Sequence, residues 1–279
     1  MASGHLNLFR PASADCPTSD VAQYFLNFLT EWKHVPFDDS ERATLSHVKI
    51  LGRLLDDRSR PFFLYHFNPA VQRALRALFA RNPRPRILEL GSGSGNFSIL
   101  CALLGADVTG VDLDPVMVSA SNKRKLAYEE AFGPLRLEFV RADAFQFLDD
   151  CPGEFDGVHF MSSFNNIQPS RRLLALVSRV LSSTGTVVIT DLNRQSIVNR
   201  LFRRRNVLRP RAVEADLHSN GVTSSRLEYR CVTAPSIFSL LPERAWYRAE
   251  ELLASIRVLA WVGVSYTLVA TKPDAEIAR

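Results

Sequence analysis

Short apolar runs alternate with helix-length segments between Arg86 and Asp191, and this alternation restricts the possible folds more than any other feature. The runs place apolar residues on both faces of the expected strands, which predicts strands covered on both sides. A parallel sheet covered by helices on both sides meets that requirement. The runs are ILEL (87–90), DVTGVD (107–112), LRLEFV (135–140), FDGVHFM (155–161) and TVVITD (186–191). The sequence therefore predicts a doubly wound α/β domain.

The residues before Arg86 predict helices, and the residues after Asp191 are less regular. N-terminal helices are expected at 21–33, at 40–57 with Ser40 as the cap, and at 68–79 after an Asn68 cap and Pro69. Later elements are expected as helices at 195–202 and 244–255, a strand at 224–232, and a terminal strand pair at 258–262 and 265–271. We predict an N-terminal helical cap (1–84) and an α/β domain (85–279) with a substrate-side insert at about 200–243.

Composition describes an ordinary globular chain and excludes several classes of protein. The 279 residues are 46% hydrophobic and 23% charged, which argues against disorder, collagen and coiled coil. No apolar run approaches about 18 residues, and the N-terminus lacks the features of a secretory signal, so a cytoplasmic location without membrane insertion is expected. The four cysteines form no CxxC pair, and no metal site is expected.

Six arginines fall within twelve residues in an otherwise mildly basic chain of net charge +5. They are Arg200, Arg203, Arg204, Arg205, Arg209 and Arg211. The cluster is interpreted either as a solvated helix end or as a surface for phosphates, an acidic substrate or a partner. Only Phe202 is aromatic there, so a stacking platform for bases is missing and nucleic acid is disfavoured.

The segment Ile87-Leu-Glu-Leu-Gly-Ser-Gly-Ser-Gly-Asn-Phe97 reads as a strand, a glycine-rich loop and a helix start. Glycines let the backbone approach a ligand closely, and a helix start directs unpaired N–H groups at it. A dinucleotide fingerprint needs a glycine where Asn96 stands, and a P-loop needs a Gly-Lys pair that is missing. The Glu89 carboxylate repels a pyrophosphate and attracts a cation such as a sulfonium amino acid.

At Glu89-Leu-Gly-Ser-Gly-Ser-Gly95 the sequence resembles the class I S-adenosylmethionine (SAM)-dependent methyltransferases of Rossmann-like fold. The resemblance implies a seven-stranded, mostly parallel sheet. It implies that Asp112 holds the ribose hydroxyls and that Asp143, in the third-strand motif, accepts from the adenine amino group. The cofactor residues implied in this way are Glu89, Gly91, Ser92, Gly93, Gly95, Asp112, Leu113, Asp143, Ala144 and Ser162.

Alternative roles stay open for some of these residues. Asp143 is also placed to cap the short helix expected near Phe145, whereas Asp114 before Pro115 fits a cap better than Asp112 does. His159, inside the fourth strand, is interpreted as a core residue.

Methyl transfer is an in-line displacement that depends on positioning, and a general base is optional. Candidates for catalysis follow strands four and five, or lie in the aromatic run 61–67, whose rings either shield a sulfonium or seal the helices onto the sheet. The catalytic candidates are Tyr65, His66, Asn165 and Asp191, and the substrate-binding candidates are Phe164, Asn166, Asn193 and Arg194.

The expected partner is a small metabolite or natural-product intermediate, with O, N, S or C as the acceptor, bound by a monomer or a homodimer. Ser162-Ser-Phe-Asn165 stands where nucleic-acid methyltransferases usually carry an Asn-Pro-Pro-Tyr type tetrapeptide. One alternative is an enzyme that uses the aminocarboxypropyl arm of SAM, by transfer or by ring closure, and releases methylthioadenosine. RNA methylation and non-catalytic SAM binding are further alternatives.

Overall fold

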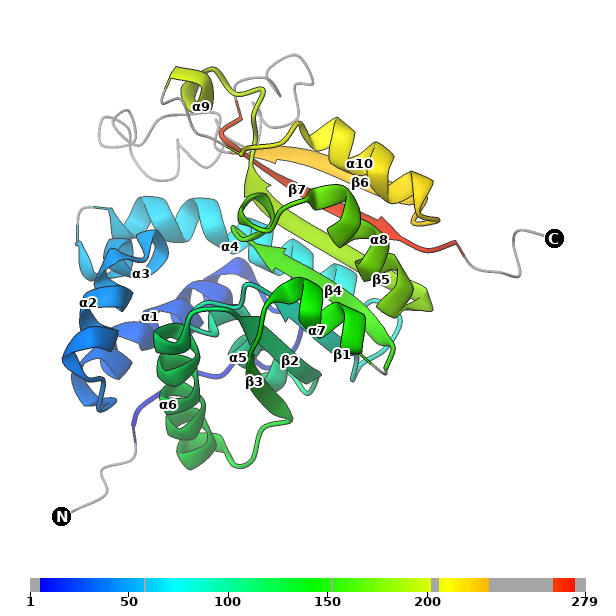
Figure 1. The fold of residues 1–279 in the computed structure, drawn as a ribbon. Coiled ribbons are helices and arrows are strands. Elements are labelled where there is room, and N and C mark those ends of the chain that lie inside the picture. Colours follow the sequence, from blue (N-terminus) through cyan, green and yellow to red (C-terminus); the bar gives the residue numbers. More distant parts are fainter. Residues whose placement is uncertain (1–5, 58, 152, 202–205, 231–262, 274–279) are drawn as a thin grey trace. The chain divides into compact units, whose positions relative to one another are not determined.

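The structure is a computed structural model that describes residues 6–57, 59–151, 153–201, 206–230 and 263–273. It divides into an N-terminal unit, Met1–Phe147, and a C-terminal unit, Leu148–Arg279. The strand order is β3-β2-β1-β4-β5-β7-β6, and β7 runs antiparallel to both of its neighbours (Figure 1). The expected seven-stranded, mostly parallel sheet with flanking helices is confirmed.

The N-terminal unit holds four helices followed by three parallel strands with connecting helices. Its elements are α1 (Thr18–His34), α2 (Asp39–His47), α3 (Lys49–Leu55), α4 (Arg60–Phe79), β1 (Arg86–Leu90), α5 (Asn96–Leu103), β2 (Asp107–Asp112), α6 (Pro115–Phe132), β3 (Leu137–Arg141) and the start of α7 (Ala144–Asp150). β2 pairs in parallel with β1 on one side and β3 on the other. The carboxyl ends of these strands therefore lie at one edge of the sheet. Gly91 directly follows β1 there, and Asp112 is the last residue of β2.

Helix α1 buries one face because its apolar residues recur at helical spacing. Val21, Tyr24, Phe25 and Phe28 are all buried, and α1 packs on α3 and α4. Helix α2 packs on α6. The predicted cap at 1–84 thus falls inside the same compact unit as β1–β3, and its separate role stays a prediction.

Two predicted helix boundaries are wrong. The single helix expected at 40–57 is two helices, α2 and α3, separated by Val48 in an extended conformation. Asp38 rather than Ser40 caps α2, because its carboxylate accepts the Glu41 N–H while the Glu41 carboxylate accepts the Asp38 N–H.

The third predicted helix also starts earlier than expected. α4 begins at Arg60 and carries Pro69 in its interior, so Asn68 is not a cap. Pro61 lies in the first turn, where its missing N–H costs nothing. The helix continues through Pro69 because Asn68, Ala70, Val71 and Ala74 are buried on either side of it, and their packing outweighs the lost hydrogen bond.

The C-terminal unit contains the remaining strands and the helices that cover them. Its elements are β4 (Phe155–Met161), the 3-10 turn η1 (Phe164–Asn166), α8 (Ser170–Val180), β5 (Leu181–Leu192), α9 (Ile197–Leu201), α10 (Pro210–Ser219), β6 (Ser224–Arg230) and β7 (Ser265–Thr271). β4 and β5 are parallel, and β7 (red in Figure 1) lies between β5 and β6. α10 packs on β6 and β7. Because β6 lies within the predicted insert at 200–243, that insert contributes a strand to the sheet.

Some expectations concern residues outside the described ranges. These are the helix at 244–255, the strand at 258–262 and the arginines at 203–205. The strand expected at 265–271 is present as β7 and pairs with β5 and β6. Of the helices that the structure describes, none is long and apolar enough to cross a membrane.

Candidate functional site

The loop between β1 and α5 turns sharply because its three glycines have left-handed backbones. The φ angles are 71° at Gly91, 53° at Gly93 and 75° at Gly95, a region that L side chains rarely adopt. A Cβ at Gly95 would lie 2.4 Å from Cζ of Phe139, whereas a Cβ at Gly93 would meet no atom within 4 Å. Gly95 is therefore required for packing and for φ, and Gly93 leaves open space beside the loop.

Asp112 ends β2 with its carboxylate directed at this loop. Its Oδ2 accepts the Gly93 N–H at 2.7 Å, and its Oδ1 accepts the Asp114 N–H at 2.9 Å. Each carboxylate oxygen has two lone pairs, so both oxygens can still accept from a ligand. Asp114 itself caps α6 through the Val116 N–H, as the sequence predicts. The predicted role of Asp112 in holding the ribose hydroxyls stays a prediction.

Glu89 lies in β1 with only 2% of its surface exposed. Its Oε2 accepts the hydroxyl hydrogen of Ser98 on α5. The carboxylate thus joins β1 to the helix that follows the glycine loop. The predicted attraction between Glu89 and a cationic amino acid stays a prediction.

Two further cofactor candidates, Ser92 and Leu113, lie in the loop or directly after Asp112. The Ser92 hydroxyl is buried and has no hydrogen-bond partner among the described residues, which marks a polar atom that a ligand can satisfy. Leu113 follows Asp112 with 66% of its surface exposed, so an apolar side chain stands free beside the carboxylate. These observations favour a ligand with both polar and apolar parts.

Asp143 caps α7, which is the alternative that the sequence left open. Its Oδ1 accepts the N–H groups of Phe145 and Gln146 at 2.9 and 3.2 Å. The residue is exposed, and Ala144 is the first residue of the helix. Contact between Asp143 and an adenine stays a prediction.

Arg124 and Ser121, both on α6, are loop contacts that the sequence analysis missed. The Arg124 guanidinium donates to the Ser94 carbonyl at 2.6 Å, and the Ser121 hydroxyl donates to the Gly93 carbonyl at 2.8 Å. The basic run Lys123-Arg124-Lys125 reads as a solvated face. The spacing of Ala120, Arg124, Ala127 and Tyr128 is the signal that would have placed Arg124 on the buried face.

In the C-terminal unit the structure brings together two predicted catalytic residues, Asn165 and Asp191. Asp191, near the end of β5, accepts the Asn165 N–H at 2.9 Å and the Leu192 N–H at 2.6 Å. Asn165 in turn accepts the Leu208 N–H at 2.9 Å. Burial raises the pKa of the Asp191 carboxyl above its ordinary value of 3.8, against the lowering effect of these N–H donors. A carboxyl with a raised pKa suits proton transfer better than an ordinary aspartate does.

The predicted substrate-binding residues have mixed environments. Phe164 is fully buried, with its ring edge-on to Phe160 at 5.2 Å between centroids. Asn193 is buried, donates to the Gly263 carbonyl and accepts the Gln195 N–H, so it orders the turn after β5. Asn166 and Arg194 are exposed. The polar groups of Asn193 are therefore used within the chain, and the guanidinium of Arg194 donates to the Val207 carbonyl at 3.4 Å.

The remaining candidates have partial descriptions. Ser162 is exposed, follows β4 and has a left-handed backbone with φ 58°. Tyr65 and His66 lie within α4 rather than in a segment before it, and their side chains are outside the described part of the structure. Phe67 packs edge-on against Phe25 of α1, with 5.5 Å between the ring centroids, and so joins two helices. The shielding and sealing roles of the aromatic run both stay predictions. His159 is buried in β4, as a core residue is expected to be.

Within the described ranges, no group of three or more His, Cys, Asp or Glu side chains is arranged to hold a metal ion. The polar chemistry of the N-terminal unit is instead that of a carboxylate, a free hydroxyl and a glycine-rich backbone. Such a set binds hydroxyl groups and approaches a ligand closely through the main chain.

The strand order and the glycine loop facing the Asp112 carboxylate are those of a Rossmann-like α/β protein. The family described as "Methyltransferase domain" matches residues 63–231. This match covers more than half of the chain, so the chain belongs to the methyltransferase-domain family.

Individual relatives agree with this assignment. The chain is 34% identical over 185 residues to a demethylmenaquinone methyltransferase of Clavibacter sepedonicus, covering 65% of this chain and 67% of that protein. It is 27% identical over 112 residues to a ubiquinone biosynthesis O-methyltransferase of Xanthomonas campestris pv. campestris (strain B100), covering 40% of this chain and 45% of that protein. The match thus spans less than half the length of the Xanthomonas relative.

A solved structure supports the fold. The magnesium protoporphyrin IX methyltransferase of Synechocystis PCC 6803, with bound SAM, has a TM-score of 0.52 at 14% identity. The superposition covers 92% of this chain and 97% of that chain. At this identity the likeness concerns the fold alone.

Proposed function

We propose that this chain is a SAM-dependent methyltransferase that acts on a small molecule. The observation that carries the proposal is the Asp112 carboxylate, directed at the Gly93 N–H across an open glycine loop in a chain of the methyltransferase-domain family. Bound SAM supplies an electrophilic methyl group on a sulfonium.

The residues around the loop have distinct proposed roles. Asp112 accepts from the ribose hydroxyls, and the unpaired Ser92 hydroxyl donates to the cofactor. Leu113 offers an apolar surface for a flat ring. Glu89, Asp143, Ala144 and Ser162 remain cofactor residues in this proposal on the strength of the sequence resemblance.

The methyl acceptor is proposed to be a small metabolite. Two relatives are named for reactions on ubiquinone and menaquinone intermediates, which favours a small organic molecule over a nucleic acid for this chain as well. Where the acceptor is a hydroxyl, its proton must leave, and Asp191 with its raised pKa is proposed as the group that takes it. A cytoplasmic location belongs to the same proposal.

Identification of reaction products tests this function. The purified protein is incubated with SAM, first alone and then with a pool of cell metabolites, and the products are separated by mass spectrometry. S-adenosylhomocysteine (SAH) that forms only with the pool, together with a metabolite heavier by one methylene, is the expected result. Methylthioadenosine formed without the pool, or no consumption of SAM, would contradict the proposal, and Asp112→Ala serves as the control for contaminating activity.

A further inference from the structure

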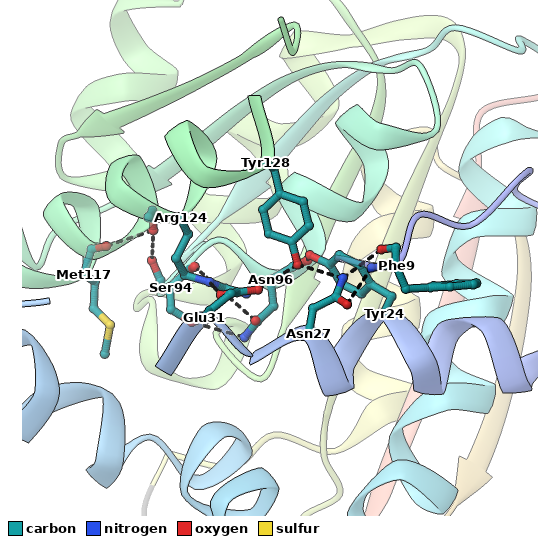
Figure 2. Close-up of polar contacts among 11 residues, drawn as sticks. Phe9, Tyr24, Asn27, Glu31, Ser94, Asn96, Met117, Arg124 and Tyr128 are labelled. Carbon is teal, nitrogen blue, oxygen red and sulfur yellow. Dashed lines mark hydrogen bonds and ion pairs between the residues drawn. The ribbon is translucent and has the colours of Figure 1, made fainter. Parts of the chain in front are cut away.

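Arg124 is a buried charge in the middle of α6, with 1% of its surface exposed. Its guanidinium forms an ion pair with Glu31 of α1, which is fully buried, through Nε and Nη2 (Figure 2). A buried charge is tolerated only when it is paired and hydrogen-bonded. The pair therefore fixes Arg124 relative to α1.

The same guanidinium reaches the glycine loop with its other nitrogen. Nη1 donates to the Ser94 carbonyl at 2.6 Å and to the Asn96 Oδ1 at 2.7 Å. Tyr24, near the middle of α1, donates its hydroxyl to the Asn96 carbonyl at 2.6 Å. Figure 2 shows Arg124, Glu31, Ser94 and Asn96 linked to one another by dashed lines, with Tyr24 in the same row of polar contacts. Helix α1 thus contacts the first residue of α5 directly through Tyr24, and the loop indirectly through Arg124.

These bonds set the direction of the loop peptides. The carbonyls of Gly93 and Ser94 face α6, where Ser121 and Arg124 donate to them. Because a trans peptide directs its C=O and N–H oppositely, the N–H groups of Ser94 and Gly95 face away from α6. The Gly95 N–H then closes the turn on the Ser92 carbonyl at 2.9 Å. Arg124 therefore supports the turn that the Gly95 N–H closes, and Ser121 on the same helix orients the peptide that carries the Ser94 N–H.

The acidic partner of Arg124 is itself held in place. Tyr128 donates its hydroxyl to Glu31 at 2.7 Å, and Asn27 donates to the Tyr128 oxygen at 3.1 Å. Burial raises the pKa of the Tyr24 and Tyr128 hydroxyls, so both keep the protons that they donate. Asn27 also exchanges hydrogen bonds with the backbone of Phe9. The network leaves Glu31 little freedom to move away from Arg124.

We propose that Arg124, held by Glu31, is a positioning residue for the cofactor, which makes cofactor affinity depend on helix α1. This inference rests on the proposed function, since it concerns the same glycine loop. A loop that already has its bound shape loses less conformational freedom on binding. Partners that orient the ligands of metal sites affect affinity about 10- to 100-fold, and we expect an effect of similar size from the anchor of this loop. Removing the anchor weakens cofactor binding without any change in a group that touches the cofactor.

The test uses a variant that keeps the fold but loses the anchor. Glu31→Met with Arg124→Met replaces the buried pair by apolar side chains of similar length, a change that is often neutral or stabilising in folded proteins. Neither methionine donates to the loop carbonyls. Lys123→Met is the matched control. Lys123 lies on α6 like Arg124, but its ion pairs are with Asp38 and with Glu41 of α2 rather than with the loop.

Affinity for SAH is measured by titration calorimetry at a temperature where thermal unfolding shows every variant to be folded. We expect the double variant to bind about tenfold more weakly or worse, Lys123→Met to stay within about twofold, and Arg124→Lys to recover part of the loss. If the wild type binds SAH and the double variant binds it with unchanged affinity, this inference is overturned and the proposed function is not affected. If the double variant does not fold, Glu31→Gln is measured in its place, with the same two readings. A wild type that does not bind SAH would overturn the proposed function and this inference with it.

Discussion

Replacing Asp112 changes cofactor affinity by an amount that follows from its hydrogen bonds. The carboxylate accepts two backbone N–H groups, from Gly93 and Asp114, and is proposed to accept two ribose hydroxyls as well. A hydrogen bond to a charged group contributes about 1.5–3 kcal/mol. Loss of two such bonds to the ribose amounts to about 3 kcal/mol at the low end, which is about a hundredfold in Kd.

The assay is titration calorimetry with SAH on Asp112→Ala and Asp112→Asn. The alanine variant is expected to lose about a hundredfold in affinity, and the asparagine variant at least about tenfold, because its amide turns one acceptor oxygen into a donor. Asp107→Asn is the matched control, since Asp107 is exposed at the other end of the same strand. If Asp112→Ala, shown to be folded, bound SAH within about threefold of the wild type, the ribose assignment would be refuted.

Three further outcomes are expected. Gly95→Ala lowers the melting temperature more than Gly93→Ala. Both substitutions cost about 1–2 kcal/mol of stability for a left-handed backbone, but only at Gly95 does the new Cβ meet Phe139. Equal falls in melting temperature would refute this. Phe164→Ala lowers the free energy of unfolding in urea by about 3–5 kcal/mol, because its ring is fully buried, whereas a ring that only binds substrate would change KM and leave stability intact. Because the pKa of Asp191 is raised in the folded state, its contribution to stability falls as the pH rises above 3.8. The free energy of unfolding of the wild type relative to Asp191→Asn, measured in urea at several pH values, is expected to decrease as the pH rises. A difference that does not change with pH would contradict the raised pKa.

The sheet was predictable because β1, β4 and β5 are buried at most of their positions and are mainly apolar. The run FDGVHFM matches β4 at both ends, and DVTGVD matches β2. Helix boundaries were less predictable, because packing outweighs local signals there. Pro69 reads as a helix start, yet the buried residues around it hold it inside α4. Val48 separates the two helices α2 and α3, where the apolar spacing alone predicts a single helix.

The residues of the candidate site were predictable where they belong to short sequence motifs. They were not predictable where segments far apart in the sequence come into contact. The glycine loop and Asp112 are close along the chain and lie on adjacent strands, so their encounter followed from the sequence pattern. Arg124 gave no such sign, since its ion pair with Glu31 joins two helices far apart in the sequence. Asn193 reads as a substrate ligand, but its amide is used within the turn after β5, which only coordinates show.

The most direct test of the proposed cofactor site is a crystal structure of the protein with SAH. The proposal predicts both ribose hydroxyls at about 2.5–3.0 Å from the Asp112 carboxylate oxygens, and the ligand against Gly93, where no protein atom stands in the way. SAH bound elsewhere on the chain, or a ribose that turns its hydroxyls away from Asp112, would contradict it.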